Sequence, residues 1–352
     1  MHISFPVDGA RIRSASVCRC DDGLMTETGP WHRWPGDCVM MDHHGDDRRS
    51  GKGGDMESDV TEETLHWSWG GMSIEVGVTR RGQGPEVLIL PALSSISTRH
   101  EMDALQTRLA ERFTTVSVDW PGFGDRPRPF MEATPAILTA FIDYLLDEVI
   151  FLPEMIVAAG HGAGMVIRHL EQHPDAADRL VLIAPTWRGP LPTMAGEHKP
   201  WFGHLRTWFD RPVIGAGIYR LNVSNWFLRR MAGEHVYETP NWLSGERLAA
   251  KRRVARTPGA RHGSIRFVTG AVDPFSRREA CVAALKGASA RTLLITSEKM
   301  PPRSRAEMRA MGALPRVDTV SLSHGRLSVH EEFPDEVAEA ILAWLDIPPQ
   351  YD

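Results

Sequence analysis

The sequence has few cysteines and no long uninterrupted apolar stretch. Four cysteines occur in 352 residues: Cys18, Cys20 and Cys38 near the N-terminus, and Cys281 alone in the C-terminal part. This distribution is not the disulfide framework of a small secreted domain, so we expect a reducing, cytoplasmic location. No apolar run approaches the ~20 residues that are needed to cross a bilayer. We therefore expect no membrane-spanning helix.

An excess of charge of either sign is also lacking. The formal net charge is -5, hydrophobic residues make up 42% of the chain and charged residues 24%. These values are ordinary for a globular protein, and a mildly acidic chain is not expected to bind nucleic acid. A chain of this length can bury a large core, and it suits one domain with an insertion, or two domains.

Residues 1–60 lack the periodicity of a helix or a strand. The segment from Asp42 to Gly54 is rich in glycine, aspartate, arginine and histidine, and it cannot bury enough apolar surface to offset chain entropy. We expect this tail to be disordered, or translation to begin at Met56. The three cysteines of the tail, together with His43 and His44, fit no standard zinc-site spacing, so no metal is predicted.

Strands and helices alternate from about Thr64 onward. Two alternating segments around Gly70 and Gly71 predict an antiparallel hairpin, and continuous apolar runs predict buried strands farther along the chain. The expected strands are 65–69, 72–78, 87–90, 115–118, 156–159, 180–183, 292–296 and 317–322. The expected helices include 101–113, 135–149, 163–172, 303–311 and 334–345. This order predicts an α/β fold with a mostly parallel eight-stranded sheet and helices on both faces.

The periodicity weakens between residues 186 and 263, where tryptophans and prolines accompany short helical patterns. We expect a helical cap here, inserted after the sixth strand, with the core formed by residues 61–185 and 264–352. The cap tryptophans could line an apolar ligand pocket or form a small core of the cap. Trp187 directly follows the sixth strand, so it is the tryptophan that we expect to face a ligand.

The chain is organised around a strand, a sharp turn and a helix between residues 156 and 168. The apolar run Ile156 to Ala159 is followed at once by Gly160-His161-Gly162-Ala163-Gly164, and a helical pattern begins there. This is the geometry of a nucleophile elbow, which normally reads G-x-S-x-G. Gly162 occupies the place of the nucleophile in this frame, and it has no side chain.

Four motifs carry a resemblance to a known family. They are the strand and loop from Leu88 to Ser95, the D-x-x-G-x-G turn from Asp119 to Gly124, the elbow from Gly160 to Gly164, and the segment from His330 to Val337. Their order and spacing resemble the α/β-hydrolase superfamily. The similarity is greatest to its capped branch, which includes haloalkane dehalogenases, epoxide hydrolases and small esterases, and it covers residues 64–345.

The resemblance implies a catalytic triad whose positions hold unsuitable residues. A nucleophile, a base and an orienting acid are required, and the nucleophile position is Gly162. The histidine of relatives lies three residues before the position of His330, which is Leu327 in this chain. His324 lies near that position, and Glu298 is the only carboxylate where the acid usually lies. Because these positions hold unsuitable residues, we assign no catalytic residue from the sequence.

Backbone groups of the site do not depend on side chains. The resemblance implies that the N–H groups of Ala163 and Ala92 form an oxyanion hole, and that the positive end of the following helix points into it. A small apolar ligand with a carbonyl or carboxylate group would fit there without a cofactor. The expected ligand-binding residues are Ala92, Leu93, His161, Gly162, Ala163 and Trp187.

Several polar residues near these motifs have both a functional and a structural interpretation. His161 could act as an acid or base, but a histidine packed beneath the elbow is the interpretation that we favour, and the same holds for His330. Ser94 and Ser95 are interpreted as loop residues, and Arg188 as a surface residue. Cys281 is expected to be buried in a helix.

Three functions are compatible with these features. The first is a protein that binds a small molecule without serine-type acyl chemistry. The second is a hydrolase or lyase that uses other acid–base groups, such as His161 or His324. The third is a non-catalytic interaction scaffold, for which a closed pocket and an exposed apolar patch are expected. The sequence makes no prediction of the oligomeric state.

Overall fold

The computed structural model of the chain describes residues 60–222 and 225–348. The expectations for the N-terminal tail, including its three cysteines and Met56, concern residues outside this part. Within the described residues, no helix combines the length and the apolar character that spanning a membrane requires.

The eight expected strands form one sheet. They are β1 (Val60–Trp69), β2 (Met72–Arg81), β3 (Glu86–Leu90), β4 (Thr114–Val118), β5 (Met155–Ala159), β6 (Arg179–Ile183), β7 (Arg291–Ser297) and β8 (Val317–Leu322). The strand order is β1-β2-β4-β3-β5-β6-β7-β8. Pairing is antiparallel from β1 to β2 and from β2 to β4, and parallel everywhere else. The predicted mostly parallel eight-stranded sheet is confirmed.

Burial explains why the central strands read as continuous apolar runs. Every residue of β5 is buried, and so are the last four residues of β3, β4 and β6. Helices cover both faces of these strands, so the buried parts of β3, β5 and β6 are apolar throughout, whereas β4 also buries Thr115 and Ser117, which donate hydrogen bonds to backbone carbonyls. The edge strand β1 is mostly exposed, and it correspondingly alternates polar and apolar residues.

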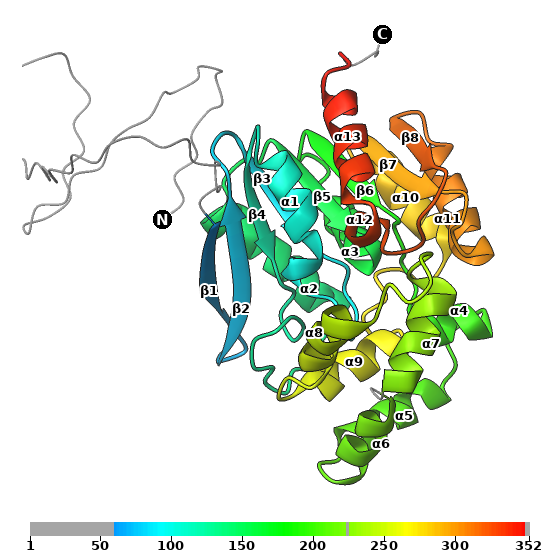
Figure 1. Cartoon of the computed structure of the whole chain (residues 1–352). Coiled ribbons are helices and arrows are strands. Elements are labelled where there is room, and N and C mark those ends of the chain that lie inside the picture. The colour runs from blue at the N-terminus through cyan, green and yellow to red at the C-terminus, as the bar shows by residue number, and fades with distance from the viewer. Residues whose placement is uncertain (1–59, 223–224, 349–352) are drawn as a thin grey trace, which may run out of the picture. The chain divides into compact units, whose positions relative to one another are not determined.

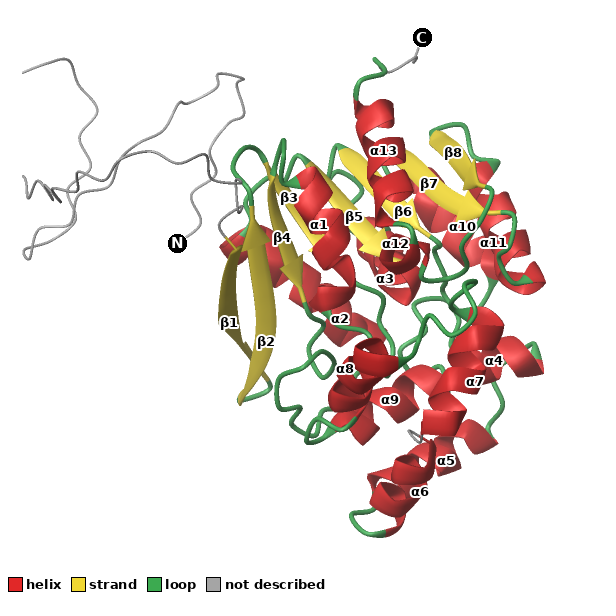
Figure 2. Cartoon of the chain, viewed as in Figure 1, coloured by secondary structure: helices red, strands yellow, loops and turns green. Residues whose placement is uncertain are grey.

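Two layers of helices sandwich the sheet, as Figures 1 and 2 show. On one face α1 (Asp103–Leu109) packs against α13 (Pro334–Leu345), next to the short α12 (Val329–Glu332). On the other, α3 (Gly160–Leu170) lies between α2 (Pro135–Tyr144) and α10 (Arg278–Gly287). The helix α11 (Pro302–Gly312) connects β7 and β8. Cys281 is buried in α10, as expected.

Two predicted helices have altered ends. The helix expected over 101–113 starts earlier with a 3-10 turn, η1 (Arg99–Met102), and α1 ends at Leu109. The helix expected over 135–149 continues after α2 as a π-helical turn, η2 (Leu145–Val149). α2 begins where predicted, because the Thr134 side chain accepts a hydrogen bond from the Ile137 N–H and Pro135 stands at the first turn.

The helical cap after β6 is confirmed. Its helices are α4 (Pro190–Ala195), α5 (Trp201–Asp210), α6 (Ile214–Asn222), α7 (Asn225–His235), α8 (Gly245–Ala255) and α9 (Ala260–Val268). The expected end of the cap at residue 263 falls inside α9. Trp187 is buried, whereas Trp201, Trp208 and Trp226 are exposed. These three do not belong to the two small apolar clusters of the cap, whereas Trp242 is partly buried and packs against one of them.

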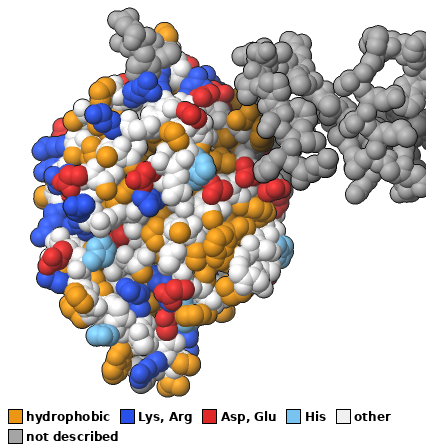
Figure 3. All heavy atoms as spheres, turned by 180° about the vertical axis from the view of Figure 1, so that it is seen from behind, with side chains coloured by type: hydrophobic (Ala, Val, Ile, Leu, Met, Phe, Trp, Pro, Cys, Tyr) orange, Lys and Arg blue, Asp and Glu red, His pale blue; other side chains and the backbone are white. Residues whose placement is uncertain are grey.

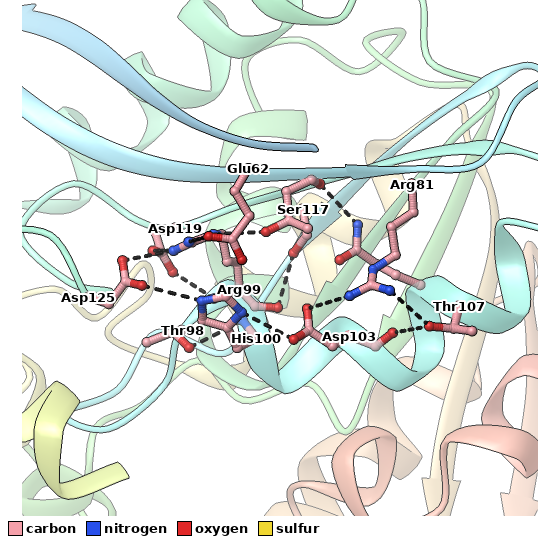
Figure 4. A network of polar contacts seen from close by, with 12 residues as sticks. Glu62, Arg81, Thr98, Arg99, His100, Asp103, Thr107, Ser117, Asp119 and Asp125 are labelled. Carbon is pink, nitrogen blue, oxygen red and sulfur yellow. Dashed lines mark hydrogen bonds and ion pairs between the residues drawn. The ribbon is translucent and has the colours of Figure 1, made fainter. Parts of the chain in front are cut away.

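A buried arginine ties the loop after β3 to the end of β4 (Figure 4). Arg99 is fully buried, and its guanidinium group lies 2.8 Å from both Asp119 and Asp125. The Arg99 N–H also donates to Asp119 Oδ1 at 2.6 Å. Gly77 of β2 lies directly beside this pair, and a Cβ there would be 2.2 Å from Arg99 Nη1. This network holds the two loops that border the elbow.

The same network changes the proton affinity of its members. Burial raises the pKa of Asp119 to about 6 in spite of Arg99. For half-buried Asp125, hydrogen bonds from His100 and Arg99 outweigh desolvation and hold the pKa well below its ordinary value. Hydrogen bonds to Asp103 and Asp125 raise the pKa of His100 from 6.5 to about 9.

The His100 interactions should make folding stability depend on pH. The folded pKa lies above the unfolded one, so the stabilisation is complete below pH 6.5 and is lost as the pH rises through about 9. Wild type should exceed His100→Ala in unfolding free energy by at most about 1 kcal/mol at neutral pH, since the side chain is partly exposed. Urea unfolding of both proteins between pH 6 and 10 measures this difference. A difference that grows with pH would contradict the assignment.

Candidate functional site

The chain turns sharply between β5 and α3. Ala159 has an extended backbone with φ -111° and ψ 151°, and Gly160, the next residue, has φ +51°. This left-handed conformation costs residues with a side chain about 1–2 kcal/mol, and glycine adopts it freely. The turn therefore lies at Gly160, and α3 begins there.

The position of the turn corrects one expectation from the sequence. Gly162 was expected at the apex, but it lies inside the first turn of α3, where a Cβ would come within 2.4 Å of the Pro91 carbonyl oxygen and 3.2 Å of Trp120 Nε1. A Cβ at Gly160 would instead face the Ala92 Cβ at 3.0 Å. The assignment of Gly162 to the apex is wrong by two residues, because the pattern G-x-G-x-G can be read in two frames.

The residues around the turn pack closely. Trp120 donates its indole N–H to the Pro91 carbonyl at 2.9 Å, which fixes the loop after β3 against α3. Leu93, which belongs to this loop, is fully buried. Trp187 is also buried, and its Cα would lie 3.2 Å from a Cβ at Gly164. The backbone of Trp187 therefore lies beside the start of α3.

The expected oxyanion hole is altered at both donors. The Ala92 N–H donates to Glu101 Oε1 at 2.7 Å, so the protein itself occupies this donor. With the apex at Gly160, the residue after the apex is His161 and not Ala163. Ala159, which precedes the helix, provides no side-chain cap. The first N–H groups of α3 are therefore the backbone donors at this turn that no side chain caps.

His161 points away from the turn and into the protein. Its Nε2 lies 3.0 Å from the carbonyl oxygen of Val272 and 3.6 Å from Asp273, and its ring packs edge-on against Phe267. Burial lowers the pKa of His161 below its ordinary value, so the ring is neutral at pH 7. These contacts join α3 to the segment after the cap, which agrees with the structural interpretation.

The other weak candidates do not meet at the turn. His324 interacts with Ser323 and Glu336 at a partly exposed position beside α13. Glu298 is exposed, while Met300 in the same turn after β7 is buried. Leu327 is partly buried and packs against the core. His330 is fully buried.

A buried polar cluster beside Ala92 was not predicted. Glu101 of η1 and His330 of α12 belong to the core, and His330 Nε2 lies 3.5 Å from Glu101 Oε1. Lys251 of α8 reaches in from the cap, with its ammonium group 2.9 Å from Glu331 and 3.5 Å from Glu101. Tyr237 donates its hydroxyl to Glu331 at 2.7 Å. The cluster joins the core to the cap, and Glu101 connects it to Ala92, the residue that faces the turn.

The charges in this cluster stabilise one another. Burial alone would raise the pKa of Glu101, but His330, Lys251 and the Ala92 N–H lower it, so the carboxylate is ionised. Burial alone would lower the pKa of Lys251, but Glu331 and the other neighbours raise it above its ordinary value. Burial raises the pKa of Tyr237, which keeps its hydroxyl protonated as a donor. The cluster can therefore offer both a buried carboxylate and a buried ammonium group.

One group of side chains has the spacing of a metal site. The ligand atoms of Asp143, His169 and His173 all lie within 4.8 Å of one another. This group lies at the far end of α3, about 13 Å from the turn by the helical rise. Among the described residues, the turn and the Glu101 cluster provide no such group.

The two glycines of the turn should respond differently to a methyl group. Gly162→Ala should lower the unfolding free energy by about 3 kcal/mol, because its Cβ meets a backbone carbonyl. Gly160→Ala should cost about 1–2 kcal/mol from its positive φ. As a control, Gly217→Ala in α6, with nothing within 4 Å, should stabilise by about 0.5–1 kcal/mol. Urea unfolding measures all three, and a harmless Gly162→Ala would contradict the assigned turn.

Removal of the Lys251 ammonium group should be costly. Lys251→Met leaves buried Glu101 and partly buried Glu331 without their cation and should lower the unfolding free energy by about 3–5 kcal/mol. Arg253→Met removes a charge from an exposed position of the same helix and should change stability by less than about 0.5 kcal/mol. Adding Glu101→Gln to Lys251→Met should recover part of the loss. Equal effects of the two single variants would show that the cluster is not buried.

Comparison with known proteins agrees with this architecture. The family model described as "Alpha/beta hydrolase family" matches residues 87–340. The haloalkane dehalogenase DatA from Agrobacterium tumefaciens is similar with a TM-score of 0.62 and 19% identity, covering 81% of this chain and 96% of that one. The epoxide hydrolase CorEH gives a TM-score of 0.62, 16% identity and coverages of 82% and 99%.

A thermophilic esterase from Thermogutta terrifontis is similar with a TM-score of 0.60 and 16% identity, covering 81% of this chain and 98% of that one. No curated protein matches the sequence. At these identities the structural likeness establishes the fold alone. The family model covers well over half of the sequence, and the chain therefore belongs to the alpha/beta hydrolase family.

Proposed function

We propose that this α/β-hydrolase-fold protein binds a small, largely apolar ligand between core and cap and does not form an acyl-enzyme. The observation that carries the proposal is Gly160, which stands at the apex with no side chain that could attack a substrate. Leu327 stands where the resemblance expects the base, and Glu298, the carboxylate at the expected place of the acid, is exposed. Removal of a triad nucleophile costs several orders of magnitude in rate.

The surroundings of the apex favour a neutral carbonyl ligand over a carboxylate. Glu101 is ionised and bonded to Ala92, and Ala92 is the residue that faces the apex. A ligand carboxylate there would be repelled by Glu101. A carbonyl oxygen could accept from the uncapped N–H groups at the start of α3. Ala92 and Leu327 are each partly exposed, and each is proposed to border the point of entry of the ligand.

An interaction scaffold is a second candidate function, and exposed apolar residues favour it. Trp201, Trp208 and Trp226 of cap helices α5 and α7 are exposed by half or more. Hydrophobic side chains are also exposed between charges of both signs on the face that Figure 3 shows. Large exposed aromatic groups are typical of contact surfaces. This function does not require a ligand beside Gly160.

The proposal predicts that the wild-type protein is not labelled by a fluorophosphonate and does not show burst release from a p-nitrophenyl ester. The reason is the absence of a side chain at the apex. Intact-mass measurement after incubation detects labelling, and an active serine esterase provides the positive control. Stoichiometric labelling at any residue would contradict the proposal.

A matched ligand pair tests the binding part. 4-Phenyl-2-butanone and 3-phenylpropanoate have similar shape, and the ketone should bind at least about tenfold more tightly because of the Glu101 charge. Calorimetry should show this binding lost in Leu327→Trp and kept in Met194→Trp, at an exposed cap position. If neither compound binds while labelling is also absent, the scaffold becomes the better description.

A further inference from the structure

A cavity of about 480 Å³ lies in the cap and outside the site described above. Its walls come from α6, from the end of α8 and from the start of α9. Neither the Gly160 turn nor the Glu101 cluster contributes a lining residue. The size is within the range of small-molecule sites, about 300–1,000 Å³. The cavity is therefore large enough for a ligand of its own.

Three arginines line this cavity from three different segments. Arg220 belongs to α6, Arg256 follows α8, and Arg261 belongs to the first turn of α9. The lining contains no acidic residue, and in the described part of the chain none of the three forms an ion pair with a carboxylate. Three guanidinium groups at one cavity repel one another unless an anion lies between them.

A fourth arginine lies behind the same wall. Arg128 is 4% exposed, and its main-chain N–H donates to the Pro258 carbonyl at 3.0 Å. Its side chain donates to the carbonyl oxygens of Gly124 and Val254, while its Nε and Nη1 have no partner among the described residues. A buried cation beneath Pro258 and Gly259 adds to the positive potential of the cavity.

The distribution of charge along the chain also favours an anionic ligand in the cap. Residues 186–263 contain thirteen arginines and lysines and five acidic residues, a net charge of +8. The whole chain has a net charge of -5, so the remainder carries -13. A strongly basic cap on an acidic protein concentrates anions near the cap. The mild overall charge conceals this separation.

The helix termini contribute less than the side chains. α9 starts at Ala260, and its positive end faces the cavity, while α8 ends at Ala255 and presents its negative end to the same space. These two dipoles largely offset each other. The guanidinium groups are therefore the source of anion attraction. Their planar, multiple N–H donors suit the oxygens of a phosphate group.

We propose that this cap cavity binds a small organic phosphate monoester. The phosphate dianion lies between Arg220, Arg256 and Arg261, and Tyr219 forms part of the wall against which the organic part packs. The site is separate from the Gly160 turn and does not depend on the function proposed for that turn.

Isothermal titration calorimetry with phenyl phosphate tests the site, at about 0.15 M ionic strength to screen weak surface attraction. Wild type should bind saturably, with one site and a dissociation constant below about 1 mM. Arg220→Gln and Arg256→Gln should each weaken binding at least about tenfold, because each removes a charge-assisted contact. Both residues are exposed, so the variants should fold, which circular dichroism verifies.

Arg229→Gln is the matched control, because it removes the same charge from an exposed position of the cap that does not line the cavity. It should bind phenyl phosphate as wild type does. The absence of saturable binding to wild type would overturn the proposal. An equal loss in all three variants would also overturn it, since attraction to the basic cap as a whole would then explain binding.

Discussion

The close approach of α3 to the loop after β3 is the constraint on which the site depends. The Pro91 carbonyl lies where a Cβ of residue 162 would stand, and Trp120 holds that carbonyl in place. Only glycine allows the helix to start so near the loop. The same close approach places Ala92 against Gly160, so the N-terminal end of α3 lies beside the loop after β3. The turn between β5 and α3 is thus tightly packed around Gly160, a residue without a side chain.

Glu101 is a buried carboxylate that is bonded to the loop beside this turn. A buried carboxylate is costly unless it is paired and hydrogen-bonded, and here the Ala92 N–H, Lys251 and His330 all surround it. The Ala92 N–H beside the turn is thus already bonded to an ionised carboxylate. A negative charge therefore lies one hydrogen bond away from Ala92, the residue that faces Gly160.

Much of the fold was predictable from the sequence, and the reason is burial on both sides of the sheet. Strands such as β5 consist only of buried residues, so each appears as an apolar run between glycines and prolines. The frame of the turn was not predictable, because Gly160 and Gly162 are identical residues and only the backbone distinguishes φ +51° from a helical value. Glu101 and Lys251 lie in helices rich in charged residues, where no local pattern separates a buried charge from an exposed one.

The ion pairs across the core–cap boundary fix the position of the cap on the core more than they stabilise the contact between the two. Removing Lys251 by mutation leaves buried Glu101 and partly buried Glu331 without their cation. An arrangement of the cap that withdrew Lys251 while Glu101 stayed buried would leave an unpaired buried charge. The cluster therefore favours the arrangement that the structure shows, in which Lys251 of the cap lies beside Glu101 and Glu331 of the core.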